Sequence, residues 1–484
     1  MPPFAYDEVP YEDYPVTETH VDALYLGATA AGLDAARPEG ARILELGCAH
    51  AVNLMPMAFH LPGATLMGMD LSAAQIDRAR ARAEALGLRN LELRQGDVMD
   101  LELGERRFDY VIAHGLYSWV PEPVRARVLA VCHHALAPAG VAYVSYNAMP
   151  AWGIRGAIAR ALTDGVDPDD PPPKRIRRAR AVLARLEQVQ PLKGTAEGAL
   201  LRAEIEGLRD KPDAYLLHEY LVPCNRAFYL REMVERAERA GLRWLGDVAP
   251  SGMPPAEHRR ARHALRSLHD DELVVEQLLD IVGFRQFRAS LFHRADAPRG
   301  PRLTPVQRLH QGVLAAPPRE PAPDDPPAAR DALERLGQRW PRDAPLAELA
   351  RDASLPPDAL AEALVEPLHD ERLRLRPRAL PIAPLGERPR VAALTRFEAA
   401  HLPFVTTPMH EHAPLDSFHA ALVGHLDGRH TRATLVDVLA RDIEAGRLPL
   451  ASGAPPPPDR LRAALASMID AGLTGLHQAG LLVP

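Results

Sequence analysis

The sequence contains little lysine, little cysteine and no long apolar run. Only three of its 57 basic residues are lysine. The three cysteines, Cys48, Cys132 and Cys224, form no CxxC pair and are odd in number, which excludes a disulfide framework and a zinc ribbon. No run reaches the roughly 18 uninterrupted apolar residues of a membrane span, and the acidic, aromatic N-terminus is unlike a signal peptide. We therefore expect a cytoplasmic protein without a membrane span.

The charge pattern excludes a further class of protein. The net charge is −7, so the basic field typical of general nucleic-acid binding is missing. The acidity lies in residues 1–150, which hold 19 acidic and 11 basic side chains, whereas the remainder is close to neutral. We expect no nucleic-acid partner, and an acidic rim in the N-terminal third.

Between residues 41 and 147 the hydrophobic pattern is regular. Short apolar or β-branched runs at 41–46, 64–70, 91–97, 108–115 and 140–147 alternate with helical patterns at 72–86 and 121–136. Ser72 and Gln75 have capping-box spacing, and Gly87 follows the first of these helices as a stop signal. The alternation predicts right-handed crossovers and an open parallel sheet of Rossmann type.

The rest of the chain predicts additions to that sheet. Residues 151–222 have a helical pattern and form an insertion, or lid, above the carboxyl edge of the sheet. After the insertion, a helix at 228–240 and strands at 241–248 and 284–294 complete the sheet. A proline-rich acidic stretch at 315–327 reads as a linker or loop. We predict an α/β protein with a catalytic domain over 1–297, a middle domain over 298–395 and a helical or winged-helix-like module over 396–484.

Three carboxylates follow successive predicted strands beside a glycine turn. The loop after the first strand has only Gly47, so a dinucleotide site with the G-x-G-x-x-G pattern is poorly supported. Glu45 stands where the amine of an S-adenosylmethionine lies, Asp70 is placed for ribose hydroxyls and Asp97 for the adenine amine. Together they predict an S-adenosylmethionine site.

Aromatic side chains follow the fourth and fifth predicted strands, which converge near the methyl donor in this fold. Tyr117 and Trp119 follow the fourth, and Tyr146 and Trp152 follow the fifth. Such a channel would attract a lysine by cation–π contact and lower its pKa by desolvation. The alternative is that both tryptophans pack the lid onto the sheet.

The histidines leave further alternatives open. His218, beside Glu219, is a candidate general base or a structural histidine, and Glu219 is a candidate partner for an arginine. His410 and His412 have i, i+2 spacing without a carboxylate cluster, which is poor metal-ligand geometry, so no metal site is predicted.

These residues belong to longer strings that carry a family resemblance. The strings are YDEVPY (6–11), ELGCA (45–49), NLMPMA (53–58), GMDLSAAQI (68–76), FDYVIAHGLYSWVP (108–121), VAYVSYN (141–147), HEYL (218–221) and LDSFHAALVGHLDG (415–428). In these strings the chain resembles bacterial class I S-adenosylmethionine-dependent methyltransferases with a methyltransferase regulatory domain, here over 215–297. That group includes the rickettsial-type lysine methyltransferases of outer-membrane proteins.

The resemblance implies a fold, a cofactor and site residues. It implies a seven-stranded methyltransferase sheet and the cofactor residues Tyr6, Tyr11, Glu45, Gly47, Cys48, Ala49, Asn53, Asp70, Leu71, Gln75, Asp97, Val98 and His114. The expected catalytic residues are Tyr117, Trp119, His218 and Glu219, and the expected substrate-binding residues are Tyr117, Trp119, Tyr146, Asn147, Trp152, Arg155 and Tyr220. It also implies a protein or peptide acceptor, of which an outer-membrane protein before export is one candidate.

Three functions remain open from the sequence. The leading hypothesis is methyl transfer to protein lysines, and the second is methylation of a small molecule or peptide natural product. The third is a non-catalytic cofactor-binding regulator. The reason for this third hypothesis is that Ala51 and Val52 stand where the family has glycines. A side chain at a position with positive φ would strain the cofactor loop.

Overall fold

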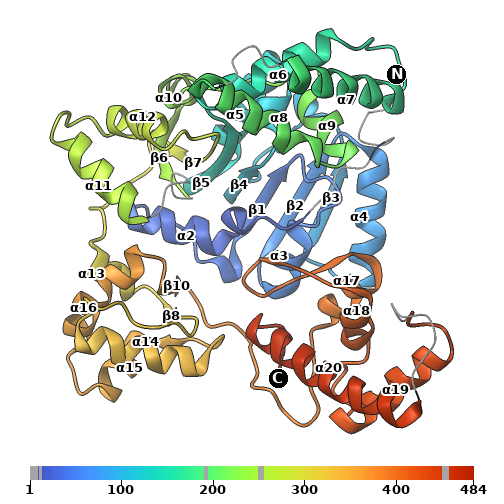
Figure 1. Cartoon of the computed structure of the whole chain (residues 1–484). Coiled ribbons are helices and arrows are strands. Elements are labelled where there is room, and N and C mark those ends of the chain that lie inside the picture. Colours follow the sequence, from blue (N-terminus) through green and yellow to red (C-terminus); the bar gives the residue numbers. More distant parts are fainter. Residues whose placement is uncertain (1–8, 10–13, 190–193, 249–254, 450–456) are drawn as a thin grey trace.

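A computed structural model describes residue 9 and residues 14–189, 194–248, 255–449 and 457–484. Its centre is a seven-stranded sheet with the strand order β3-β2-β1-β4-β5-β7-β6 (Figure 1). The strands are β1 Arg42–Leu46, β2 Thr65–Asp70, β3 Leu91–Gln95, β4 Phe108–Ala113, β5 Leu136–Asn147, β6 Leu242–Asp247 and β7 Phe287–Arg294. The first five pair in parallel and β7 runs antiparallel between β5 and β6. The predicted Rossmann-like, seven-stranded α/β fold is confirmed.

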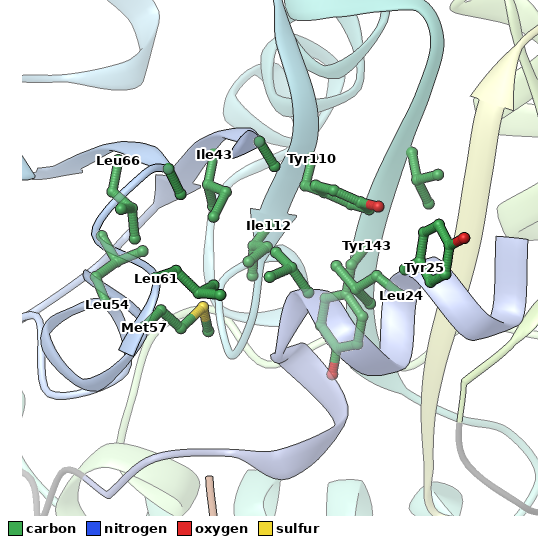
Figure 2. Close-up of a cluster of buried hydrophobic side chains, with 14 of the residues drawn as sticks. Leu24, Tyr25, Ile43, Leu54, Met57, Leu61, Leu66, Tyr110, Ile112 and Tyr143 are labelled. Carbon is green, nitrogen blue, oxygen red and sulfur yellow. The ribbon is translucent and has the colours of Figure 1, made fainter. Parts of the chain in front are cut away.

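The sheet forms because its central strands are apolar on both sides. Four of the five residues of β1 are buried, and Ile43 pairs between Leu66 of β2 and Tyr110 of β4. Successive residues of a strand point to opposite faces, so Ile43 and Leu44 enter two different hydrophobic clusters. Figure 2 shows the first cluster, in which Ile43, Tyr110 and Tyr143 meet side chains of the covering helices.

Helices cover both faces of the sheet. The first cluster contains side chains of α2 Val21–Ala30, α3 Leu54–His60 and α4 Ala73–Ala85, and the second contains side chains of α5 Glu122–Ala135 and α10 Leu230–Arg239. The predicted start and end of α4 are confirmed. The Ser72 side chain accepts a hydrogen bond from the backbone N–H of Gln75, and Gly87 has a φ of +68° just after the helix.

Two strands start three or four residues away from the predicted positions, whereas the other strand boundaries agree within two residues. β5 begins at Leu136, four residues before the predicted start, and its register against β4 is irregular between Phe108 and Tyr110. β7 begins at Phe287 rather than at residue 284. The reason is local, because Phe284 has a φ of +46° and lies in the turn that ends the preceding helix.

The predicted insertion is helical and has its own hydrophobic cluster. It consists of α6 Trp152–Asp164, α7 Pro172–Val189, α8 Ala196–Arg209 and α9 Asp213–Tyr220. Because α6 starts just after β5 ends, the insertion lies at the carboxyl edge of the sheet (Figure 1). Two further helices, α11 Pro255–Arg266 and α12 Glu272–Val282, lie between β6 and β7 in the chain.

The remainder contains two more hydrophobic clusters. One joins α13 Pro305–Leu309, β8 Val313–Ala315, α14 Pro327–Arg339, β9 Ala344–Pro345, α15 Leu346–Asp352, α16 Pro357–His369 and β10 Arg374–Arg376. The other joins α17 Ala393–His401, β11 Phe404–Thr406, β12 His412–Pro414, α18 Ser417–Gly424, α19 Arg432–Glu444 and α20 Pro458–Gln478. This C-terminal cluster already includes Val391, within the segment predicted as the middle domain. In the described part of the chain, no helix is long and apolar enough to cross a membrane.

Candidate active site

The loop between β1 and α3 turns through three residues with left-handed backbone. The φ angles are +75° at Gly47, +47° at Ala49 and +55° at Ala51. A non-glycine residue costs about 1–2 kcal/mol in this conformation. The predicted strain therefore falls on Ala51, and additionally on Ala49, whereas Val52 is not among the positive-φ residues.

Asp70, at the end of β2, holds the shape of this loop. Its Oδ2 accepts a hydrogen bond from the backbone N–H of Ala49 at 2.9 Å, and its Oδ1 accepts one from the N–H of Ser72, also at 2.9 Å. The carboxylate thus joins the β1 loop to the start of α4. Charge-assisted hydrogen bonds of this kind are stronger than neutral ones, which helps the loop to keep its left-handed residues.

Glu45 and Asn53 form the buried part of the site. The Asn53 amide Nδ2 donates to Glu45 Oε1 at 3.0 Å, and both side chains are less than a tenth exposed. The Asn53 carbonyl oxygen accepts hydrogen bonds from the backbone N–H of Val16 at 3.2 Å and from Nε2 of His410 at 2.7 Å, with the Thr19 hydroxyl 2.9 Å away. A carbonyl oxygen has two lone pairs, so hydrogen bonds from within the protein occupy the acceptor capacity of the Asn53 oxygen.

The other predicted cofactor residues differ in exposure. Asp97 is exposed and accepts a hydrogen bond from the backbone N–H of Met99 at 2.9 Å, which caps the short turn Val98–Asp100. Leu71 is 48% exposed, whereas Cys48 and Gln75 are buried. Tyr6 and Tyr11 lie outside the described residues.

A pocket of about 110 Å³ opens next to the end of β4. Its walls are Val16, Glu18, His114, Tyr143, Arg285, Phe287 and Ala289. His114 Nδ1 lies 3.0 Å from the Tyr143 hydroxyl, and burial lowers the pKa of His114 to about 4. Because this histidine is neutral near pH 7, the pocket wall it forms carries no charge from the imidazole.

The two tryptophans predicted to bind substrate contact each other. Trp119 and Trp152 pack edge to face, with ring centroids 6.2 Å apart. Trp152 Nε1 donates to Asn225 Oδ1 at 3.0 Å, and Asn147 Nδ2 donates to the same oxygen at 3.2 Å. The Arg155 guanidinium lies 5.5 Å from the centroid of the Trp152 ring. Trp152 is buried and Trp119 is half-buried. The burial of Trp152 favours the alternative that this ring packs the insertion onto the sheet, and Trp119 is the more exposed ring of the pair.

Two predicted aromatic residues lie deeper in the protein. Tyr117 is fully buried in the second sheet cluster, 5.2 Å from the ring of Phe228. Tyr146 is 1% exposed, and its hydroxyl lies 3.1 Å from Ser290 Oγ. Both side chains therefore support the sheet from within its core in this structure.

His218 and its neighbours Glu219 and Tyr220 make contacts within the protein. His218 is buried and its Nε2 donates to the Val9 carbonyl at 2.6 Å. Burial lowers the pKa of His218. The Glu219 backbone carbonyl accepts a hydrogen bond from Asn225 Nδ2, and Tyr220 lies against Tyr215 with ring centroids 6.1 Å apart. This geometry favours the structural alternative for His218.

No group of three or more potential metal ligands occurs among the residues that the structure describes. The residues that the sequence interpretation missed are His410, which contacts Asn53 from 357 positions away, and Glu18 and Arg285 in the pocket wall. No local pattern marks these three, because each is brought to the site only by the tertiary fold.

Comparisons with known proteins agree with this architecture. Residues 43–140 match the family model "Methyltransferase domain", residues 212–294 match "Predicted methyltransferase regulatory domain", and residues 387–481 match "PKMT, C-terminal winged helix domain".

Two relatives come from Rickettsia prowazekii. The uncharacterized protein RP789 is 35% identical over 296 residues, which are 60% of this chain and 53% of RP789. The uncharacterized protein RP028 is 29% identical over 241 residues, which are 50% of this chain and 96% of RP028. The alignment thus spans only about half the length of RP789.

A solved structure shares the whole fold. PKMT2 from Rickettsia typhi in complex with AdoHcy aligns with a TM-score of 0.85 and 22% identity, over 98% of this chain and 100% of that one. Three segments of the chain thus match family models of a methyltransferase domain, a predicted methyltransferase regulatory domain and a PKMT C-terminal winged helix, and they lie on a fold shared with PKMT2.

Proposed function

We propose that the protein transfers methyl groups from S-adenosylmethionine to lysine side chains of a protein acceptor. The observation that carries the acceptor class is the similarity to PKMT2 over 98% of the chain, which extends far beyond the sheet. The match of residues 387–481 to the winged-helix domain of PKMT proteins supports the same acceptor class. An outer-membrane protein before its export is a candidate acceptor.

The residues around the β1 loop fit the proposed cofactor by their chemistry. Glu45, Asp70 and Asp97 place carboxylates at or near the carboxyl ends of three neighbouring strands, which suits a ligand with a cationic sulfonium and amine and with ribose hydroxyls. The positive φ of Gly47 lets the backbone approach the ligand closely. We assign Asp70 to the ribose hydroxyls, Asp97 to the adenine amine and Glu45 to the methionine amine.

The residues at the acceptor side of the proposed site promote methyl transfer by positioning the acceptor amine and removing water from it. When bound, S-adenosylmethionine supplies an electrophilic methyl group. The half-buried Trp119 would orient the acceptor amine and exclude water from it, and the buried Trp152, with Arg155 against its ring, would hold Trp119 in place. An apolar surface lowers the pKa of a lysine, so the amine reaches the methyl group in its neutral, nucleophilic form. Neutral His114 adds no positive charge that would repel the incoming lysine.

The pH dependence of methyl transfer should follow the acceptor. We expect kcat/KM on a lysine peptide to rise about tenfold per unit between about pH 6.5 and 8.5, since the free lysine pKa is about 10.4. His114 has a pKa of about 4 and stays neutral over this range. Initial rates in buffers of constant ionic strength measure the profile. An inflection near pH 6.5 that disappears in His114→Asn would contradict the assignment of a neutral His114.

The second candidate is methylation of a small molecule, and one experiment separates the two. The protein is incubated with methyl-labelled S-adenosylmethionine and a bacterial extract, and label is counted in the protein and small-molecule fractions. Label on lysines in the protein fraction is expected, with Asp70→Ala as the inactive control. Label confined to the small-molecule fraction would contradict the proposal of a protein acceptor. Cofactor binding without any label would favour the non-catalytic regulator.

A further inference from the structure

The C-terminal module reaches the cofactor site through one tight turn. This turn, residues 407–411, joins β11 to β12 and lies beside α3 (Figure 1). The His410 N–H donates to the Thr407 carbonyl at 2.9 Å, and the Thr407 N–H donates to the Glu411 carbonyl at 2.8 Å. His410 itself has a φ of +61° and is 2% exposed. The turn is therefore well defined and directs one buried imidazole into the catalytic domain.

Three contacts hold His410 in place, two through its imidazole and one through its backbone carbonyl. Its Nε2 donates to Asn53 Oδ1 at 2.7 Å, and its ring lies against the ring of His20 with centroids 4.9 Å apart. The hydroxyl of Thr17 donates to the His410 backbone carbonyl at 3.1 Å. The turn is thus fixed by both its side chain and its backbone.

The contacts of Asn53 determine the orientation of its amide. The Val16 backbone N–H can only donate, so the atom that faces it is the carbonyl oxygen, and the amide nitrogen faces the Glu45 carboxylate. His410 must therefore carry its proton on Nε2 to bond with that oxygen. One line of hydrogen bonds runs from the C-terminal turn through Asn53 to Glu45.

The charge state of His410 agrees with this role. Burial lowers the pKa of His410 well below its ordinary value, and the electrostatic influence of His20 and His60 lowers this pKa further. A neutral imidazole has one N–H donor and one acceptor nitrogen, and the donor is used on Asn53.

We infer that His410 is a positioning residue for the cofactor site, through which the C-terminal module sets the orientation of Glu45 by way of Asn53. The inference rests on the assignment of Glu45 to the methionine amine in the proposed function. It gives the C-terminal module a role in cofactor affinity that is separate from any role in holding the acceptor.

Equilibrium binding of S-adenosylhomocysteine to the full chain tests this inference. His410→Leu fills the buried site with an apolar side chain and removes the donor. It should raise the Kd about tenfold, because the Asn53 oxygen loses its shortest hydrogen bond and keeps only those from Val16 and Thr19. His410→Gln restores an N–H donor and should keep the Kd within about threefold of wild type. His401→Ala, at an exposed position in α17 where the imidazole stacks on a phenylalanine ring of the same helix, is the matched control and should leave the Kd unchanged.

Kinetic and thermal readouts distinguish positioning from a merely structural role. In His410→Leu the KM for S-adenosylmethionine should rise while kcat at saturating cofactor stays near wild type. A lower thermal midpoint with an unchanged Kd would overturn the inference. If the leucine variant does not fold, Thr17→Val, which removes only an exposed hydroxyl contact to the His410 carbonyl, should raise the Kd about two- to threefold. An unchanged Kd in that variant would overturn the inference equally.

These binding measurements use no acceptor. A shifted Kd together with the absence of lysine methylation would therefore reject the proposed function and leave the role of His410 standing. An unchanged Kd together with lysine methylation would reject the role of His410 and leave the proposed function standing.

Discussion

Replacement of Arg288 by methionine is expected to lower the free energy of unfolding by about 3–5 kcal/mol, the cost of breaking a buried ion pair. Arg288 lies in β7 and its side chain is fully buried. Its Nε donates to both carboxylate oxygens of Asp280, at 3.1 and 3.0 Å, and its Nη1 donates to Asp247. Methionine fills much of the volume but leaves three carboxylates, those of Asp247, Asp280 and Glu276, with less compensation.

The size of this effect should depend on pH in a defined direction. Burial raises the pKa of Asp280 to about 6, and Arg288 opposes that rise. A carboxyl with a raised folded pKa makes the native state less stable as the pH increases above its unfolded value of about 3.9. Without Arg288 the pKa of Asp280 should rise further, so the loss of stability should be larger at pH 7.5 than at pH 5.

Urea unfolding of both proteins at the two pH values measures this prediction. Arg294→Met is the matched control, because Arg294 is on the same strand but pairs at 2.8 Å with the exposed Asp296. The control should leave the midpoint nearly unchanged. Equal destabilisation by both variants, or a larger loss at pH 5 than at pH 7.5 for Arg288→Met, would contradict the account of the buried network.

Replacement of Asp70 by alanine is expected to weaken cofactor binding about a hundredfold, equivalent to two lost hydrogen bonds to a charged group at about 1.5 kcal/mol each. In the proposed site the carboxylate accepts the ribose hydroxyls. It also accepts the backbone N–H groups of Ala49 and Ser72. The variant therefore loses both the ligand contact and the brace of the β1 loop.

Calorimetric titration with S-adenosylhomocysteine measures the loss. Asp77→Ala is the control, since Asp77 lies one turn into α4 with an exposed side chain paired with Arg80. Its Kd should equal that of wild type. A Kd for Asp70→Ala within threefold of wild type would remove Asp70 from the ribose site.

The sequence predicts most of the sheet because its signals there are local. Apolar runs of strand length alternate with helices whose ends are marked by residues such as Ser72 and Gly87, and the structure has these elements in place. The boundary errors arise where backbone conformation departs from the pattern. Phe284 is apolar and fits a strand by type, yet its φ of +46° delays the start of β7.

The site was predictable only in part, because some contacts depend on distant segments. Glu45, Asp70 and Asp97 are proposed for the cofactor from their places at strand ends, which the sequence marks locally. His410 contacts Asn53 only because the C-terminal turn folds back onto α3, and the spacing of MHEH gives no sign of it. The burial of Tyr117 was equally hidden, since its position after β4 suggests a channel, whereas its side chain lies in the core.

The scarcity of lysine in the chain simplifies a direct test of the proposed reaction. Of the three lysines, Lys174 is paired with Asp170 at 2.6 Å and Lys211 lies 5.0 Å from the centroid of the Tyr215 ring. The protein thus offers few amines of its own, and self-methylation should add little background.

The most direct test is mass spectrometry of a lysine-containing outer-membrane protein after incubation with the protein and S-adenosylmethionine. The account predicts whole-methyl mass increments that map to lysines, and their absence when the same acceptor has been acetylated on its lysines beforehand. Increments that persist on the acetylated acceptor, or that map to residues other than lysine, would contradict it.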